Sequence, residues 1–453
     1  MRGMRLLVLS VLSVILVVED VKALGPHEVL LLANGRSPES IDIADTYARL
    51  RGIPEQNILR LNIAREDDGW PHTISPAEFT RLIWRPATRV VQQRGLEDQL
   101  LVWVYSTDFP IRISTTPPIS IQGITFLRNQ LPDSEAVKMG TYHSPLFTGP
   151  DNVNIRPHIS QTFDTYAEWL RDEMPLPSMM LGYSGKKGNS LDRIRTCLSR
   201  GVASDGSSPT GTVYFVQTKD VRSECRQWQH VGATYDINVS GLEVVVTDQE
   251  PQGRSNVLGI QMGAANVRPD RNTYLPGSMA EHLTSEAAIF YKDSQTKLTK
   301  WIEAGVTASC GTVVEPYNVW TKFPSAYFYY HYTSGCSMIE SFYQSIRCPL
   351  QILLVGEPLA SPWKPALRVS LQDLDSAEIR EQVTIRPKVE GIKFARFTYL
   401  IDGKRVATGP TFTLDPSELP AGEHRLRIVA NGNGLVKVQA FHEETVVVVA
   451  PVQ

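Results

Sequence analysis

The sequence predicts an α/β protein with a largely parallel sheet, followed by an all-β domain. Between residue 28 and about residue 355, short apolar runs alternate with segments of helical periodicity, as parallel strands and their crossover helices do. After Pro365 the helical periodicity stops and short strand-like runs follow at close spacing. We therefore predict an α/β domain over residues 24–364 and a β-sandwich over residues 365–453.

The N-terminus has the three-part order of a secretory signal peptide. Two arginines precede the apolar run Leu6–Val18, and residues 21–23 resemble a small-residue cleavage site. The run of about 13 residues is shorter than the roughly 20 residues that span a bilayer. We predict removal of residues 1–23 and a periplasmic, cell-surface or extracellular location. An uncleaved anchor is the alternative, because Glu19 and Asp20 are unusual near a cleavage site.

Composition excludes several classes of function. The chain has 42% hydrophobic and 21% charged residues and a formal net charge of -3, so no basic field for nucleic acid is expected. No phosphate-binding loop, dinucleotide fingerprint, zinc-protease motif or nucleophile-elbow motif is present. We expect no cofactor, no metal site and no membrane span after signal cleavage. The expected partner is a peptide, a protein or a glycan.

The first half of the α/β domain begins with one strand-helix-strand unit. Glu28–Ala33 is predicted as a buried strand, a helix starts at Pro38 and stops before Gly52, and Asn57–Leu61 is the next strand. A capping box opens a helix at Ser75 that reaches Gly95, and the strand Gln99–Tyr105 follows.

That strand ends in Ser106, Thr107 and Asp108. Polar side chains at the end of a parallel strand are placed where ligands bind. The following segment, Thr115–Pro177, reads as long and irregular. Beyond it, the predicted elements are strand Ser178–Tyr183, helix Leu191–Leu198, strand Thr212–Gln217, helix Asp220–His230, strands Leu242–Val246 and Val257–Met262, helix Gln295–Ala304, and strand Gln351–Val355 after a capping box at Ser337.

The segment Ala304–Asn318 is the centre of the predicted domain. Val306–Cys310 reads as a buried strand that runs into a Gly-Thr turn and then Glu315. Upstream, Ser278 and Glu281 have capping-box spacing and predict a short helix that carries His282. Downstream, the aromatic segment Tyr317–Tyr332 is either a packed cover over the sheet or a platform for a sugar or peptide.

Four residues are candidates for catalysis. Cys310 is either a nucleophile at the ligand edge of the sheet or a buried apolar thiol. His282 and Ser285 could form an imidazole-hydroxyl pair or make ordinary hydrogen bonds. Glu315 could bind a substrate or hold the following loop. Among these side chains only His282 is a good general base near neutral pH.

Five cysteines are present and none form a C-x-x-C motif. In an exported protein some are expected to pair. The economical pairs are Cys197 with Cys225 and Cys336 with Cys348, which leave Cys310 free.

The C-terminal domain is predicted from six short strands and two turn signals. Asp402-Gly403 indicates a hairpin, and Gly432 with Gly434 indicates another turn. The spacing is immunoglobulin-like, without paired cysteines. The predicted strands are Arg368–Leu371, Val383–Val389, Phe397–Ile401, His424–Ala430, Val436–Phe441 and Thr445–Val449.

Several segments resemble an uncharacterised family of exported bacterial proteins over roughly Glu28 to Trp363. The resemblance is carried by NGRSPESIDIADTYARLRGIPEQN, LPGSMAEHLTS, AGVTASCGTVVEPYN, SMIESFYQSI and LLVGEPLASPW.

More remotely, the layout is similar to the caspase-type fold of gingipain-like cysteine peptidases. SMIESFYQSI and Gly356-Glu357-Pro358 look like the helix and closing turn that follow the catalytic strands there. The resemblance implies a three-layer caspase-like sandwich with an immunoglobulin-like module after it. It places the catalytic histidine near residues 261–263 and the catalytic cysteine near Thr284-Ser285, where this chain has neither residue type.

Two classes of function follow from these observations. One is an exported hydrolase, peptidase-like, with a non-standard active site drawn from His282, Ser285, Cys310 and Glu315. The other is a non-catalytic cell-surface or extracytoplasmic binding protein that retains a caspase-like fold.

Overall fold

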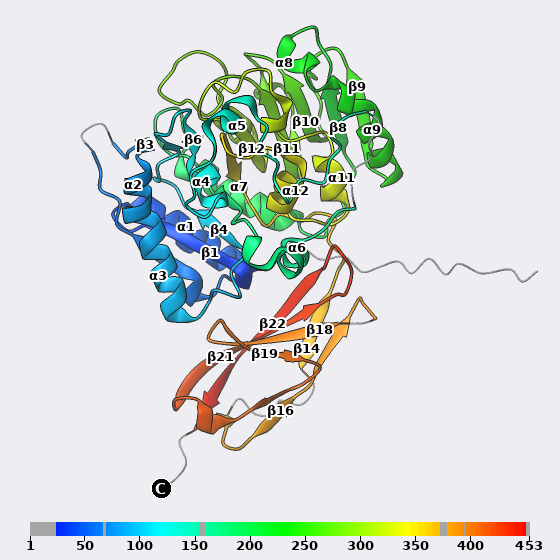
Figure 1. Cartoon of the computed structure of the whole chain (residues 1–453). Helices are drawn as coiled ribbons and strands as arrows, with labels where there is room; N and C mark the ends of the chain where they lie inside the picture. Colours follow the sequence, from blue (N-terminus) through cyan, green and yellow to red (C-terminus); the bar gives the residue numbers. More distant parts are fainter. Residues whose placement is uncertain (1–23, 67–68, 154–158, 372–377, 394, 450–453) are drawn as a thin grey trace, which may run out of the picture.

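The computed structural model describes residues 24–66, 69–153, 159–371, 378–393 and 395–449. The predicted signal peptide, residues 1–23, lies outside the described residues. The described chain has a body of helices around a large sheet, and a C-terminal part built from several smaller sheets (Figure 1).

Ten strands form the sheet of the body, in the order β2-β1-β4-β7-β13-β12-β11-β10-β8-β9. These strands are β1 (Val29–Asn34), β2 (Ile58–Leu61), β4 (Val102–Tyr105), β7 (Ser178–Met180), β8 (Thr212–Val216), β9 (Glu243–Thr247), β10 (Val257–Gly263), β11 (Tyr274–Leu283), β12 (Ala308–Thr312) and β13 (Ile352–Gly356). A small side sheet contains β3 (Thr73–Ile74), β5 (Arg112–Ile113) and β6 (Ile119–Ser120).

The large sheet contains two parallel units. In the first unit, β2-β1-β4-β7, every neighbouring pair is parallel. The same holds in the second unit, β9-β8-β10-β11-β12. In each unit, the second strand along the chain lies on one side of the first, and the third strand lies on the other side. The strand order therefore reverses between β1 and β4, and again between β8 and β10. β13 lies between the units and is antiparallel to β12.

Helices cover both faces of the sheet, which explains why its strands are apolar on both sides. The helices are α1 (Pro38–Arg51), α2 (Pro76–Phe79), α3 (Arg85–Arg94), α4 (Ile121–Phe126), α5 (Ser134–Met139), α6 (Phe163–Leu170), α7 (Leu191–Ser204), α8 (Val221–Glu224), α9 (His230–Val239), α10 (Thr299–Ala304), α11 (Phe328–Thr333) and α12 (Met338–Ser345).

Contacts between elements assign several helices to a face. α7 packs against α1 and α10. On the other face, Trp84 at the start of α3 contacts Trp103 of β4, and Thr125 of α4 bonds Tyr105 of the same strand. Trp103 and Tyr105 are two residues apart, so α3 and α4 cover the same face.

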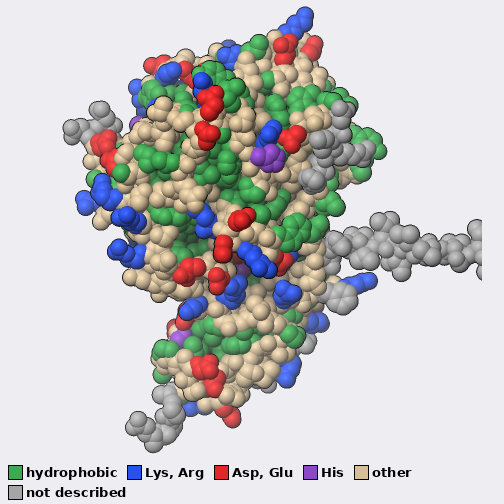
Figure 2. Space-filling view, viewed as in Figure 1, with side chains coloured by type: hydrophobic (Ala, Val, Ile, Leu, Met, Phe, Trp, Pro, Cys, Tyr) green, Lys and Arg blue, Asp and Glu red, His purple; other side chains and the backbone are tan. Residues whose placement is uncertain are grey.

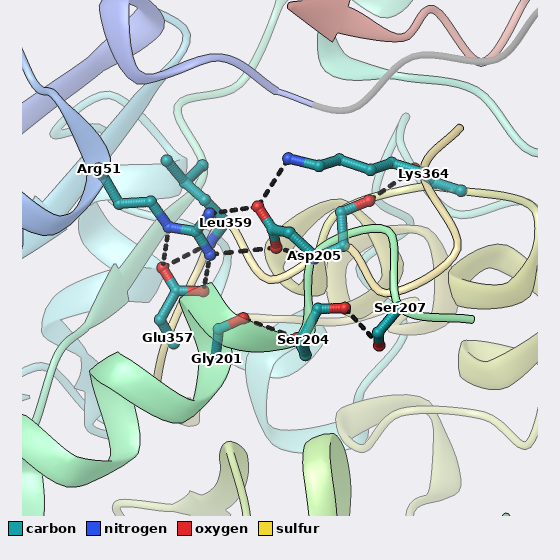
Figure 3. A network of polar contacts seen from close by, with 10 residues as sticks. Arg51, Gly201, Ser204, Asp205, Ser207, Glu357, Leu359 and Lys364 are labelled. Carbon is teal, nitrogen blue, oxygen red and sulfur yellow. Dashed lines mark hydrogen bonds and ion pairs between the residues drawn. The ribbon is translucent and has the colours of Figure 1, made fainter. Parts of the chain in front are cut away.

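The carboxyl ends of the two units lie at the same edge of the sheet, which we call the carboxyl edge. Tyr183, after β7, stacks on Phe290, after β11, with ring centroids 3.9 Å apart. At the opposite edge, Arg51 at the end of α1 bonds Glu357 after β13 and Asp205 after α7 (Figure 3). Lys364 bonds the same Asp205 at 2.7 Å.

Three sequence predictions for the body are wrong in part. Ser278 and Glu281 do not cap a helix, because residues 274–283 form the buried strand β11. Pairing with β10 and β12 on either side outweighs the local capping pattern. The segment predicted as irregular, residues 115–177, contains the helices α4, α5 and α6 within its described part. Cys310 lies in the middle of β12 rather than at its end.

The cysteine pairs are also not formed. All five cysteines are free, and four of them are buried. Cys197 contacts the backbone carbonyls that precede β12, whereas Cys225 contacts the carbonyl of Arg222 beside it. Each thiol of this pair therefore has a local partner in a different part of the body.

The described residues of the C-terminal part form three groups of paired strands around a core of their own. Asp402-Gly403 forms the predicted hairpin between β18 and β19, whereas the two last predicted strands are one strand, β22. The strands are β14 (Arg368–Leu371), β15 (Glu378–Ile379), β16 (Val383–Ile385), β17 (Pro387–Glu390), β18 (Arg396–Ile401), β19 (Lys404–Gly409), β20 (Phe412–Leu414), β21 (Gly422–Asn431) and β22 (Gln439–Val448).

Polar contacts join this part to the body. Arg427 donates to the carbonyl of Gly52, and Gln99 donates to the carbonyl of Gly403 at 2.8 Å. Lys437 forms ion pairs with Asp164 and Glu168 of α6. Acidic and basic side chains are intermingled on the visible face of this junction (Figure 2).

Candidate functional site

His282 is fully buried in β11, and both of its ring nitrogens are hydrogen-bonded. The indole N–H of Trp301 donates to Nδ1 at 2.9 Å, so the imidazole proton lies on Nε2 and is donated to the carbonyl of Thr296 at 3.1 Å. Burial lowers the pKa of His282 to about 3, with Arg226 and Lys297 lowering it further against the carbonyl of Thr296. At neutral pH this side chain is an uncharged structural group, with no free nitrogen to accept a proton.

Cys310 lies on the opposite face of the sheet from His282. Met279 of β11 pairs in parallel with Ala308 of β12, and continuing this register places Glu281 beside Cys310 and His282 beside Gly311. Cys310 is completely buried, and burial raises the pKa of its thiol well above the ordinary value, with the charge of Glu281 adding to the effect. The structure does not bring this thiol and the imidazole together.

The other two predicted residues lie in loops at the carboxyl edge. Ser285 is half-buried, two residues after the end of β11. Glu315 is exposed after β12 and accepts a hydrogen bond from the backbone N–H of Tyr317 at 2.9 Å, so it orders its own turn. Most of the aromatic segment around Tyr317–Tyr332 is buried, as expected of a packed cover.

The carboxyl edge of the second unit is filled where its strand order reverses. A Cβ atom on Gly263, the last residue of β10, would lie 2.1 Å from the backbone of Arg222 in α8. Beneath this contact, Arg226 and Glu281 form an ion pair at 2.6 Å, with side chains that are 2% and 0% exposed. The backbone of α8 and this pair leave no room for a ligand over the strand ends.

The carboxyl edge of the first unit is built from short polar side chains. Asn34 ends β1, and its amide donates to the backbone carbonyl of Asp108 at 3.1 Å. Ser37 caps α1 by accepting from the N–H of Ser40, and donates its own hydroxyl proton to Oδ2 of Asp108. Ser40 donates to the carbonyl of Thr107 at 2.7 Å. The first helix is thus fixed to the exit of β4.

Asp108 is the centre of this arrangement. Its backbone is in the left-handed region with φ 61°, which Asp tolerates better than most residues. Oδ1 accepts from the hydroxyl of Ser184 at 2.6 Å, and that serine also contacts the hydroxyl of Thr107. Ser184 follows β7, so one carboxylate connects the exits of three strands, β1, β4 and β7.

A cavity of ≈ 1010 Å³ opens directly above this cluster. It is lined by Arg36, Pro38, Glu39, Ala64, Arg65, Gly69, Trp70, Pro71, His72, Asp108, Phe109, Tyr183, Ser184, Gly185, Lys186, Asn189, Ser190 and Leu191. It lies where the strand order reverses between β1 and β4, the usual ligand position in open α/β sheets.

Positive charge predominates on the described wall of the cavity. Arg36, Arg65 and Lys186 are exposed and form no ion pair with another described residue. The acidic residues of the described wall are Glu39 and Asp108, and both carboxylate oxygens of Asp108 accept hydrogen bonds from serine hydroxyls. The helices α1 and α7 begin at the wall, and the positive ends of their dipoles add to the field. The arrangement suits a small anion.

His72 is neutral under ordinary conditions. Burial lowers the pKa of its half-buried ring, while the charge of Glu66 opposes this, and the ring contacts the hydroxyl of Tyr183 at 2.9 Å. Sequence reasoning identified Asp108 as a strand-exit residue but missed Ser184 and His72. The available signal was the glycine-rich stretch Gly182–Gly188 after a buried strand.

The described residues contain neither a metal-binding cluster nor a membrane-spanning helix. In the parts of the chain that the structure describes, no group of three His, Cys, Asp or Glu side chains is arranged to hold a metal ion. Nor does any described helix combine the length and apolar character needed to cross a membrane.

Comparisons with known proteins give little. No family profile matches the sequence, and no curated protein matches it significantly. Fibronectin(III)-like modules of Clostridium thermocellum CbhA are 14% identical over 23% of this chain and 54% of that chain, with a TM-score of 0.16. The endo-beta-1,4-mannanase of Thermotoga petrophila is 12% identical over 56% and 49%, with a TM-score of 0.14. The chain spans about half the length of each structure, and such low TM-scores carry no argument.

Proposed function

We propose that this chain is an exported, non-catalytic binding protein that holds a small anionic ligand at the carboxyl edge of its first parallel unit. The observation that carries the proposal is the ≈ 1010 Å³ cavity with Arg36, Arg65 and Lys186 on its wall. Its floor is the hydrogen-bonded cluster around Asp108, which is held by three strand exits and is therefore preorganised.

The contacts of the predicted catalytic residues favour binding over hydrolysis. A nucleophile and its base must lie within hydrogen-bond reach of each other. Both ring nitrogens of His282 are hydrogen-bonded, one to Trp301 and the other to Thr296, and Cys310 points to the other face of the sheet. A hydrolase would need a different base, and no described contact of Ser285 supplies one.

We propose that the body is of caspase-like type. The order of β9-β8-β10-β11, the helices on both faces and the exits of β10 and β11 at one edge support this assignment. On this reading Gly263 and Ser285 stand at the positions of a lost histidine and a lost cysteine. The paired strands after residue 367 support an immunoglobulin-like module, and the N-terminal sequence pattern supports export.

Binding of simple anions tests the proposal. Calorimetric titration with inorganic phosphate and pyrophosphate should show saturable binding that weakens as salt is added, because the wall charges are exposed. Each of the single variants Arg36→Gln and Lys186→Gln should lose about tenfold to a hundredfold in affinity, since a hydrogen bond to a charged group contributes about 1.5–3 kcal/mol.

Arg49→Gln is the matched control. Arg49 is an exposed arginine near the far end of α1, away from the cavity wall, so its loss should leave the affinity unchanged. Absence of binding by a folded wild-type chain at about 10 mM anion would contradict the proposal, because such an affinity is negligible. Specific labelling of Ser285 or Cys310 by acyl-phosphonate or thiol probes in the folded protein would favour the hydrolase instead.

A further inference from the structure

Helix α9 carries an apolar stripe on its outer side. Val231, Tyr235 and Val239 follow one another at intervals of four residues and are 79%, 64% and 73% exposed. On the inner side, Ala233 and Ile237 are buried, and α9 packs on β9 at the outer edge of the large sheet (Figure 1). The helix is therefore apolar on both sides, whereas the outer side of a surface helix is ordinarily polar. No part of the described chain covers this stripe.

The only N-glycosylation sequon of the sequence lies beside the stripe. Asn238-Val239-Ser240 fits the pattern Asn-x-Ser/Thr, and every other asparagine of the chain lacks a serine or threonine two positions later. Such an acceptor is expected on the surface of an exported protein. The three residues of the sequon are exposed, at the end of α9, where helices fray. Asn238 comes three residues after Tyr235, so the two side chains are neighbours on the helix surface.

The hydrogen bonds of Asn238 leave its amide nitrogen available. Oδ1 accepts from the backbone N–H of Val244 at 3.1 Å. A backbone N–H is only a donor, so the amide atom that faces it is the oxygen. Nδ2 has no partner among the described residues. Glycan transfer takes place on this nitrogen and leaves the oxygen an acceptor, so the bond to Val244 is compatible with the modified side chain.

We propose that Asn238 is the acceptor of an N-linked oligosaccharide, which covers the apolar stripe of α9. In the transfer, Nδ2 attacks the anomeric carbon of a saccharide carried on a lipid diphosphate. The N–C bond forms as the C–O bond to the diphosphate breaks. The lipid diphosphate leaves with the bonding electrons, and one amide proton passes to a base of the transferase.

The neighbouring side chain suits an attached saccharide. Tyr235 offers an exposed ring with an apolar face and a polar hydroxyl. The inference rests on the export part of the proposed function and is independent of the anion site.

Mass spectrometry of the protein purified from its native cells tests the attachment. Trypsin cleaves after Arg226 and Arg254 and releases one peptide that contains the sequon. In the exported chain this peptide should carry a saccharide that fragmentation places on Asn238. An exported chain in which the peptide is found only unmodified would overturn the inference and leave the proposed function standing. If the chain is found only in the cytoplasm, this inference and the predicted export both fall, whereas anion binding is measured separately.

Variants expressed in the same cells give matched controls. Ser240→Ala destroys the sequon and should remove the saccharide completely, whereas Ser240→Thr retains the pattern and should keep it. Asn266→Gln changes an exposed asparagine outside any sequon and should keep it as well. A saccharide that persists in Ser240→Ala would contradict attachment at this sequon.

Binding of Nile red, a neutral apolar dye, tests the covering role. Ser240→Ala should bind several-fold more dye than the glycosylated wild type, because Val231, Tyr235 and Val239 become accessible. Adding Tyr235→Ser and Val239→Ser to this variant should return dye binding to the wild-type level. Equal dye binding by Ser240→Ala and a wild type with an occupied sequon would overturn the covering role. A concentration-dependent dimer in sedimentation would then identify a second copy of the chain as the cover.

Discussion

The two parallel units repeat one strand order, and their carboxyl edges are built in opposite ways. In the first unit, short hydroxyl and amide side chains around Asp108 close the strand exits and leave a cavity above them. In the second unit, the backbone of α8 lies on Gly263, and the pair of Arg226 and Glu281 is sealed below it. Equal topology thus yields one site that is open and one that is filled.

The comparison teaches that strand order alone does not make a binding site. A crevice is expected at both reversals of strand order. At the second one, the crevice is occupied by groups that stabilise the body, so changes there should affect folding. Changes at the first edge should mainly affect binding.

Removal of Arg226 should have the largest effect on stability. Arg226→Met leaves Glu281 buried without its cation, and breaking such a pair costs about 3–5 kcal/mol of unfolding free energy. Urea unfolding measures the loss. The double variant Arg226→Met/Glu281→Leu should recover most of it, whereas Arg193→Met, in a half-exposed pair with Glu303, should cost below about 1 kcal/mol. If Arg226→Met and Arg193→Met lower the unfolding free energy equally, the buried ion pair does not stabilise the second edge more than an ordinary surface pair would.

Acid should lower the unfolding free energy because His282, at the filled edge, is buried in its neutral form. Its pKa is about 3 in the folded chain, and near 6.5 once unfolded, so the unfolded chain binds the extra proton between these values. The stability is therefore fully present above pH 6.5 and falls as the pH falls toward 3. This group should lower the unfolding free energy by about 2 kcal/mol between pH 7 and pH 5.

The pH slope isolates this contribution from the cost of the substitution. His282→Gln should flatten the slope of unfolding free energy against pH between pH 7 and pH 5 by about one proton, whatever its stability at pH 7. His72→Gln, at the open edge, should flatten it less because that ring is only half-buried. An unchanged slope for His282→Gln would mean that the imidazole is charged in the folded chain.

Loss of the cap of α1 should have a moderate effect. Ser37→Ala removes the hydroxyl that accepts from Ser40 and donates to Asp108, and cap losses cost about 0.5–2 kcal/mol. Ser190→Ala, at the exposed cap of α7, should cost less. Thermal unfolding with ligand titration should also show weaker anion binding for Ser37→Ala. The opposite order of the two stabilities would argue against Asp108 as the centre of the open edge.

The smallest effect is expected at Ser278. Its pattern with Glu281 predicts a cap worth about 1 kcal/mol, but in β11 its hydroxyl is buried without a partner in the described chain. Ser278→Ala removes an unsatisfied group and should change the unfolding free energy by no more than about 0.5 kcal/mol. A loss above about 1 kcal/mol would show that this hydroxyl has a partner that the structure lacks.

The same case shows how far the sequence could predict the fold. Capping boxes are predicted at Ser75, Ser278 and Ser337, and the first and last of these serines do cap helices. At Ser278 the surrounding residues are buried on both faces, and pairing with two neighbouring strands decides the outcome. Local pattern predicts an element when no long-range pairing competes with it.

The site was harder to predict for a related reason. Asp108 could be identified because a polar residue directly follows a buried strand. The positions of Cys310 and His282 on opposite faces depend on the register between β11 and β12, which a single sequence does not reveal. Ser184 and Asn189 lie some 80 residues beyond Asp108, and only the parallel pairing of β4 with β7 brings them to it.

The cluster of Arg51, Glu357, Asp205 and Lys364 has a mechanical consequence (Figure 3). α1 and α7 are each 14 residues and thus about 21 Å long, and both begin at the cavity wall. Arg51 and Asp205 join their far ends by an ion pair. Asp205 also binds Lys364, which lies shortly before the first strand of the C-terminal part. The two helices are therefore joined at this end. A ligand that changes the distance between their N-terminal ends would act through Asp205 on the segment that leads into the C-terminal sheets.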